Sequence, residues 1–182
     1  MRIDSVTIRK AKPEDAGGWE TLSNRVWRDA YRHIFPEEVF LERESRFAEK
    51  TARFNDWAKN DSESITCVAE YDGTIIGIMC GSIRSFYEPF HSDFADLIAL
   101  YVDRAFQGRG IGTAFRKTFE EWACENGASQ YVIGVLKENH KARKVYEVWG
   151  GKLSEQEQAF VKWNVAYPEV FYTFSLKSST KP

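Results

Sequence analysis

The chain has 182 residues, of which 43% are hydrophobic and 29% charged, with 25 lysine and arginine residues against 27 aspartate and glutamate residues. Its formal net charge of −2 argues against a dedicated nucleic-acid-binding protein, which normally carries a basic excess. No segment approaches the ~18 consecutive apolar residues of a membrane span, and the N-terminus lacks the apolar run of a signal peptide.

The first third of the chain reads as one short strand followed by helices. Residues 6–11 alternate apolar and polar side chains, as a half-buried strand does. Pro13 suits a first helical turn, and apolar residues at helical spacing follow from Trp19 to Ala30. A second helix is expected over about 36–59, with glutamate–arginine pairs four residues apart on its wet side. Its apolar stripe consists of Phe40, Phe47 and Phe54.

From residue 64 the apolar pattern changes to the period of two that is typical of strands. Residues 65–71 and 74–83 are expected to form a hairpin around Asp72-Gly73, the strongest kind of two-residue hairpin signal. After a loop at 85–93, a strand at 94–102 is more continuously apolar, which favours a central place in the sheet.

The second half of the chain indicates a strand–helix–strand crossover. An amphipathic helix is expected from residue 111 to Gly127, and a buried strand follows at 131–136. Because the helix connects two strands of one sheet, the strands at 94–102 and 131–136 should be parallel. A helix and two strands joined by a longer connection complete the chain at 139–149, 152–163 and 170–176.

The order βααβββαβαββ predicts an α/β fold, a mixed β-sheet with helices on its faces. We expect a single domain over residues 1–177 and a frayed tail at 178–182. The cysteines are an odd number without a CxxC pair, so we expect reduced thiols in a cytoplasmic protein. They are Cys67, Cys80 and Cys124.

The sharpest local motif is the glycine-rich segment Gln107-Gly108-Arg109-Gly110-Ile111-Gly112, which lies between a strand and a helix. Its alternate glycines let the backbone approach a bulky group, and the free N–H groups of the helix start favour an anion. A phosphate or pyrophosphate is the natural ligand. The segment lacks the Gly-Lys-Ser/Thr of a P-loop and the GxGxxG spacing of dinucleotide-binding folds. A strand-to-helix turn that binds nothing remains an alternative.

These residues resemble the GNAT superfamily of acyl-CoA-dependent N-acyltransferases. The family signature Gln/Arg-x-x-Gly-x-Gly/Ala is matched by Gln107, Gly110 and Gly112. The family's Asn-x-x-Ala-x-x-x-Tyr is matched by residues 139–146, one strand later. The element order also agrees, so the resemblance extends over nearly the whole chain, and it implies two central parallel strands that splay apart.

The resemblance implies acetyl-CoA as co-substrate, with no metal. Its pantetheine arm would add to the edge of the central strand, and its pyrophosphate would bind the glycine-rich segment and the helix start. Asn139 would hydrogen-bond the pantetheine or the neighbouring backbone. The cofactor-binding residues so implied are Leu100, Tyr101, Val102, Gln107, Gly108, Arg109, Gly110, Ile111, Gly112, Thr113 and Asn139.

The reaction that the resemblance implies needs a base for the attacking amine and an acid for the departing thiolate. Tyr146 matches the family's tyrosine and is our candidate acid. Asp96, on the central strand, is our candidate base, with a water relay or Glu88 as alternatives. Val102 N–H is the oxyanion donor by analogy. The histidines share no ligand spacing and Ser62 and Ser64 have no neighbouring histidine, so no metal site or serine nucleophile is expected.

The expected activity is therefore acetyl transfer from acetyl-CoA to a primary amine of a small molecule or peptide. The alternatives are a transferase for longer acyl chains and a non-catalytic acyl-CoA-binding sensor. The expected partner is the amine acceptor, neither nucleic acid nor membrane, with a homodimer left open. Six aromatic residues in the two segments that shape the acceptor site in this family suggest an aromatic pocket. They are Trp27, Tyr31, Phe35, Phe86, Tyr87 and Phe90.

Overall fold

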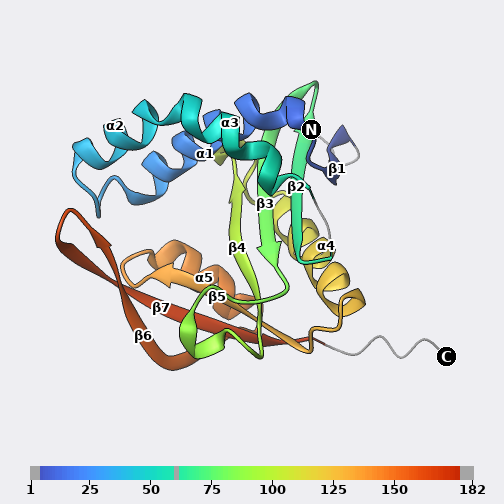
Figure 1. Ribbon diagram of the computed structural model, residues 1–182, viewed down its shortest axis with the longest axis vertical. Coiled ribbons are helices and arrows are strands. Elements are labelled where there is room, and N and C mark those ends of the chain that lie inside the picture. The colour runs from blue at the N-terminus through green and yellow to red at the C-terminus, as the bar shows by residue number, and fades with distance from the viewer. Residues whose placement is uncertain (1–4, 60–61, 177–182) are drawn as a thin grey trace. The chain divides into compact units, whose positions relative to one another are not determined.

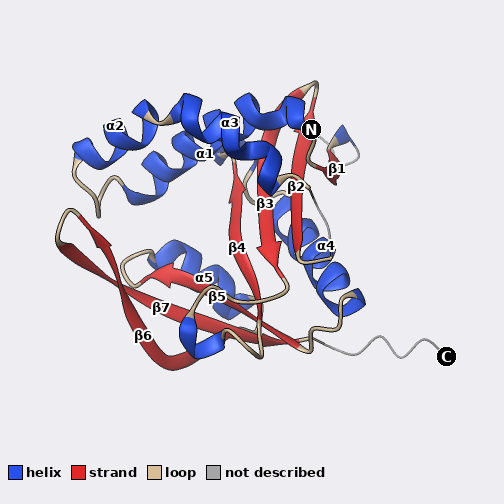
Figure 2. Ribbon diagram, viewed as in Figure 1, coloured by secondary structure: helices blue, strands red, loops and turns tan. Residues whose placement is uncertain are grey.

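The structure is a computed structural model that describes residues 5–59 and 62–176. The described residues form two compact units, one made of those up to 81 together with 99–122 and the other of 82–98 together with those from 123 onward. Strand β4 (Ala95–Val102) contributes to both. The hydrogen-bonded strand order is β1-β2-β3-β4-β5-β7-β6, in a mostly antiparallel sheet (Figure 2). The mixed α/β fold expected from the sequence is confirmed.

In the first unit, the strands follow the predicted hairpin pattern. The strands are β1 (Thr7–Lys10), β2 (Ser64–Tyr71) and β3 (Thr74–Ser82). Strand β1 pairs antiparallel with β2. Asp72 and Gly73 both have positive φ, 48° and 70°, which is the backbone of the tight turn that matches the twist of a hairpin. The Asp-Gly signal therefore identified both the turn and its conformation.

The helices of the first unit include a closely associated group of three, which lie side by side (Figure 1). They are α1 (Ala16–Tyr31), α2 (Glu37–Ser45) and α3 (Phe47–Trp57). The crossover helix α4 (Ile111–Glu125) begins in the first unit and ends in the second, where Gly127, two residues beyond its last residue, has a φ of 89° and supplies the predicted left-handed cap. On α4, Phe115 lies so close to Gly77 of β3 that a Cβ there would be 2.8 Å from its ring.

The prediction of a single helix over 36–59 is wrong, because the helix is interrupted at Arg46, whose backbone has φ −88° and ψ 13°. Just before the break, the Ser45 hydroxyl donates a hydrogen bond of 2.8 Å to the Glu42 carbonyl, and such side-chain bonds compete with the helix ladder. The break moves Phe47 off the apolar stripe, leaving it 38% exposed, whereas Phe40 and Phe54 are buried. The element order therefore has one helix more than expected.

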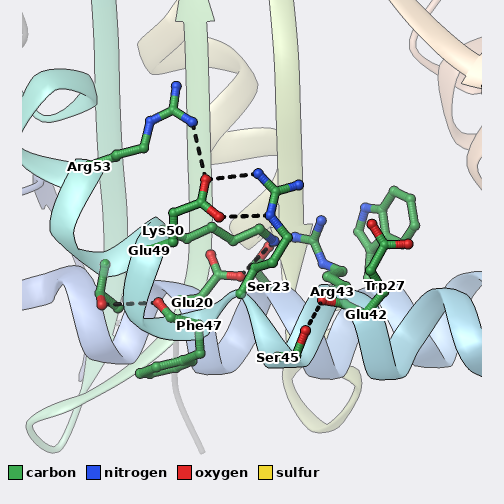
Figure 3. A network of polar contacts seen from close by, with 12 residues as sticks. Glu20, Ser23, Trp27, Glu42, Arg43, Ser45, Phe47, Glu49, Lys50 and Arg53 are labelled. Carbon is green, nitrogen blue, oxygen red and sulfur yellow. Dashed lines mark hydrogen bonds and ion pairs between the residues drawn. The ribbon is translucent and has the colours of Figure 1, made fainter.

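A polar network joins the three N-terminal helices (Figure 3). Lys50 on α3 pairs with the buried Glu20 on α1 at 2.9 Å. Arg43 on α2 donates to Ser23 Oγ at 2.6 Å, and its guanidinium lies 4.6 Å from the centre of the Trp27 ring. These contacts fix the helices that the family resemblance assigns to the acceptor side. Below them, one buried cluster consists of Ala11, Leu22, Val26, Phe54, Val68 and Ile78.

The second unit contains the predicted parallel pair. Strand β5 (Gln130–Leu136) pairs parallel with the start of β4, Ala95 with Tyr131 and Asp96 with Val132. Among the described residues of this unit, the register stops there, so Leu97 and Ile98 have no partner on β5. A short buried cluster of Phe90, Val132 and Phe171 lies beside this pair.

The remaining elements of this unit are α5 (His140–Val148), β6 (Lys152–Lys162) and β7 (Val165–Ser175). The expected longer connection between the last two strands is wrong, because β6 and β7 form a long hairpin with a two-residue turn (Figure 2). Trp163 and Asn164 both adopt positive φ, 50° and 60°, the conformation of a tight hairpin turn. Strand β7 was expected to begin only at Val170, but it begins at Val165 and includes Pro168. Although Pro168 has no backbone N–H, its carbonyl accepts a hydrogen bond from Lys137 N. The tail at 178–182 lies outside the described residues.

Candidate active site

Asp96 lies at the second position of β4 and is enclosed by the turn that follows β3. Its carboxylate is buried, with 1% of the residue exposed. Atom Oδ2 accepts hydrogen bonds from the Ser85 hydroxyl at 3.1 Å and from the Phe86 backbone N–H at 3.2 Å. Atom Oδ1 is equally buried and has no hydrogen-bond partner among the described residues. One oxygen therefore fixes the orientation of the side chain, and the other has no hydrogen-bond partner among the described residues.

The turn that holds Asp96 is itself fixed by its own backbone. Ser85 N–H donates to the Phe94 carbonyl at 2.8 Å, and Ser85 Oγ accepts from Tyr87 N–H at 3.1 Å. The Ser85 carbonyl lies 2.7 Å from His91 Nδ1. Because Ser85 is completely buried and bonded on all sides, it holds the carboxylate in one orientation.

Burial raises the pKa of Asp96 from 3.8 to about 7. The loss of hydration is the largest cause, because it disfavours the charged form. The bonds from Phe86 and Ser85 lower the pKa, and the negative charge of Glu169 raises it. A carboxylate whose pKa lies near neutrality is a far better proton acceptor at pH 7 than an ordinary aspartate.

Tyr87 connects the same turn to strand β7. Its ring packs edge-on against Phe171, with centroids 4.6 Å apart, and its hydroxyl donates to Glu169 Oε1 at 3.2 Å. The Tyr87 side chain passes over Gly134 of β5, where a Cβ would lie 2.3 Å from its hydroxyl oxygen. Any side chain at this position would require the Tyr87 hydroxyl to move. The second oxygen of Glu169 accepts from Gln158 Nε2 of β6 at 2.8 Å.

In the first unit, the glycine-rich segment forms an open turn before α4. Gly108 and Gly110 have φ values of 72° and 83°, which residues with a side chain rarely adopt. The Gln107 side chain donates to the Val102 carbonyl at 2.9 Å and so fixes the start of the turn to the end of β4. Arg109 lies over the Phe106 ring, 5.6 Å from its centre. No acceptor among the described residues takes the backbone N–H groups of 108–113. An anion would find several donors there.

The second motif, residues 139–146, lies in the other unit. Asn139 is the N-cap of α5, because its Oδ1 accepts from Ala142 N–H at 3.2 Å. The structure thus shows a backbone contact for Asn139 and a reason for an asparagine at this position. Tyr146 is half-buried on α5, with its ring packed edge-on against Tyr172, 5.7 Å between centroids. Glu88, the alternative base, is exposed in the short helix Glu88–Phe90.

The six aromatic residues fall into two groups, one in each unit. Trp27 stacks on Phe35 at 5.4 Å and meets Tyr31 edge-on at 4.8 Å, while its indole N–H donates to the Tyr101 hydroxyl at 3.1 Å. Phe35 is buried as a core residue. In the other unit, Phe90 is also buried in the core, and Phe86 is 68% exposed. The aromatic acceptor pocket stays a prediction.

Sequence reasoning missed four residues around Asp96, which are Ser85, Gly134, Gln158 and Glu169. They come from different strands and loops, and no short-range pattern connects them. Ser85 donates a hydrogen bond to Asp96, 11 residues away in the sequence, and Tyr87 donates one to Glu169, 82 residues away. Within the two described stretches, no group of three or more His, Cys, Asp and Glu side chains is arranged to hold a metal. No helix among the same residues is long and apolar enough to cross a membrane.

These features define an acyltransferase-like fold with a buried carboxylate on its central strand. The Acetyltransferase (GNAT) family model matches residues 24–150, so the chain belongs to the GNAT family and is an N-acetyltransferase. It is 27% identical over 162 residues to thialysine N-epsilon-acetyltransferase of Mus musculus, covering 84% of this chain and 88% of that protein. It is 25% identical over 136 residues to the N-acetyltransferase YuaI of Bacillus subtilis, covering 74% of this chain and 73% of that protein.

Solved structures show the same fold. PaiA N-acetyltransferase of Thermoplasma acidophilum, in complex with coenzyme A, superposes with a TM-score of 0.74 at 19% identity, covering 94% of this chain and 99% of that one. YncA of Salmonella typhimurium, with acetyl-CoA, gives a TM-score of 0.66 at 20% identity, covering 98% of each chain.

Proposed function

We propose that the protein transfers the acetyl group of acetyl-CoA to a primary amine of a small molecule or peptide, by direct attack of the amine on the thioester. The observation that carries this proposal is the Asp96 carboxylate, buried on the central strand with one oxygen unpartnered and a pKa of about 7. Such a group is costly to bury in a purely structural role.

The residues of the first unit fit the phosphate end of acetyl-CoA. The open backbone donors of 108–113 and the two glycines with positive φ suit a pyrophosphate. Arg109 adds a positive charge to the same turn. Leu100, Tyr101 and Val102 end the central strand, where the pantetheine arm would bind. Bound acetyl-CoA supplies an activated acyl thioester, and the protein supplies orientation and proton transfer.

Asp96 fills the role of general base. An aliphatic amine with a pKa near 10.4 is neutral in only about one molecule in 2,500 at pH 7, a cost of roughly 4.6 kcal/mol. Because Asp96 is buried, it takes the proton through a bridging water molecule, and Oδ1 is the oxygen free to accept it. Glu88 is exposed, so we favour Asp96 over it.

Tyr146 fills the role of general acid, because it occupies the family's tyrosine position on α5. Its proton goes to the sulfur of the departing thiolate. Asn139 caps the start of this helix and thereby fixes its first turn.

The test is a screen of amines with acetyl-CoA, read by product mass. It includes polyamines, amino acids, aminoglycosides and peptide N-termini. Tyr146→Phe should lower kcat and leave the affinity for acetyl-CoA nearly intact. Acetyl-CoA at about 100 times its Kd should add roughly 2.7 kcal/mol to the free energy of unfolding.

Three outcomes separate the alternatives. Unchanged turnover in Tyr146→Phe removes this residue from its role. Tight acetyl-CoA binding without any acetylated amine favours the sensor, and faster transfer from a longer acyl-CoA favours the other transferase. No thermal shift at millimolar acetyl-CoA contradicts the whole assignment.

A further inference from the structure

Glu169 lies on the same face of the sheet as Asp96. Asp96 pairs with Val132, and along β5 the next residues on that face are Gly134 and Leu136. Leu136 pairs with Glu169 on β7 in an unbroken register. Side chains of paired residues point to the same side of a sheet, so both carboxylates rise from one face.

Gly134 leaves room for the Glu169 side chain on this face of the sheet. Glu169 Oε1 reaches back along the strand to within 3.0 Å of the place where a Gly134 Cβ would stand. Gly134 is two residues along β5 and one strand across from Asp96, on the order of 8 Å in regular sheet geometry. Tyr87 and Gln158 hold one oxygen of Glu169 each, which keeps its carboxylate at this position.

Neither carboxylate has a positive partner. Among the described residues, no lysine, arginine or histidine forms an ion pair with Asp96 or Glu169. His91 lies in the turn around Asp96, and its Nδ1 is 2.7 Å from the Ser85 carbonyl oxygen. The face therefore carries two acidic groups that form no ion pair among the described residues, and one of them has a buried oxygen without a hydrogen-bond partner.

We propose that Glu169 binds the ammonium group of the acceptor beside Asp96, so that the acceptor is an amine that enters as its cation. This inference rests on the proposed acetyl transfer and names its acceptor class. Glu169 is the half-buried carboxylate of the two, and both of its hydrogen-bond donors, the Tyr87 hydroxyl and the Gln158 amide, are neutral groups. Asp96 is the buried inner one, whose unpartnered oxygen is left for the proton. Two carboxylates in different surroundings thus take different roles.

The test measures binding without turnover. The protein saturated with CoA is titrated with n-butylammonium chloride and, separately, with n-butanol, its neutral counterpart. Nuclear magnetic resonance follows the backbone amides of Gly134 and Glu169. We expect n-butylammonium to shift these signals at millimolar concentration and n-butanol to leave them unchanged. Glu169→Gln should weaken the binding of n-butylammonium roughly three- to tenfold, because a charged partner becomes neutral.

Glu155→Gln is the matched control, because it makes the same change on an exposed residue of β6. It should bind n-butylammonium like the unmodified protein. Tyr87→Phe is the second variant if Glu169→Gln fails to fold. It keeps the ring against Phe171, removes only the hydroxyl that holds Glu169, and should weaken binding about twofold.

The proposal is overturned if n-butylammonium produces no shift, if n-butanol binds equally well, or if Glu169→Gln binds as before. Failure of the proposed function has a different signature. A protein that binds n-butylammonium through Glu169 but acetylates no amine would refute acetyl transfer and retain the ammonium site.

Discussion

Replacing Asp96 with asparagine tests separately how this residue affects the stability of the fold and how it contributes to acetyl transfer. Asparagine has the shape of a protonated aspartate and can accept the same bonds from Ser85 and Phe86. It removes the ionisation that burial opposes. We therefore expect Asp96→Asn to be more stable than the unmodified protein at alkaline pH and nearly inactive.

The magnitude follows from the pKa of Asp96, which rises from 3.8 in an unstructured chain to about 7 in the fold. At 1.36 kcal/mol per pH unit, this difference corresponds to about 4 kcal/mol. Because the folded pKa is raised, the folded protein holds its proton more tightly than the unfolded chain. The contribution of protonated Asp96 to the free energy of unfolding is fully present below about pH 4 and is lost as the pH rises through 7. Between pH 5 and pH 8 the loss of unfolding free energy is roughly 2–3 kcal/mol.

The assay is urea unfolding of both proteins at pH 5 and pH 8, together with acetyl transfer to the best amine of the screen. The free energy of unfolding of Asp96→Asn relative to the unmodified protein should increase by roughly 2–3 kcal/mol from pH 5 to pH 8. Transfer should fall by a factor of roughly 10²–10⁴, the usual contribution of a general base. A stability difference that does not change with pH would refute the reasoning on burial. Full activity in Asp96→Asn would refute its role as base.

Two other predictions test the packing. Gly134→Ala should destabilise the protein by about 1–3 kcal/mol in urea unfolding, since its Cβ would lie 2.3 Å from the Tyr87 hydroxyl oxygen; an unchanged unfolding midpoint would show that Tyr87 moves aside freely. Burial raises the pKa of the Cys67 thiol to about 11, so iodoacetamide at pH 8 should modify the partly exposed Cys124 first, as mass spectrometry of peptides would show. Equal rates at the two thiols would contradict the burial of Cys67.

Local patterns predicted most of the secondary structure because their causes are local. The Asp72-Gly73 turn needs positive φ at adjacent residues, and the Gly127 cap needs a left-handed residue, so both can be read from residue type. The interruption of the helix at Arg46 could not be predicted in this way, because no glycine or proline lies there. The Trp163-Asn164 turn was missed for a similar reason, because its first residue is a tryptophan in a conformation that bulky residues rarely adopt.

The sequence by itself determined the family, the order of the strands and the places of Asp96, Tyr146 and the glycine-rich segment along the chain. All of these depend on residue types at fixed short spacings. Only the tertiary structure decided the surroundings of Asp96, because contacts between distant segments create them. The Ser85 turn, the burial that raises the Asp96 pKa to about 7, and Glu169 on the same face exist only once the strands are paired. A carboxylate becomes a base through its environment, and that environment is made by the fold.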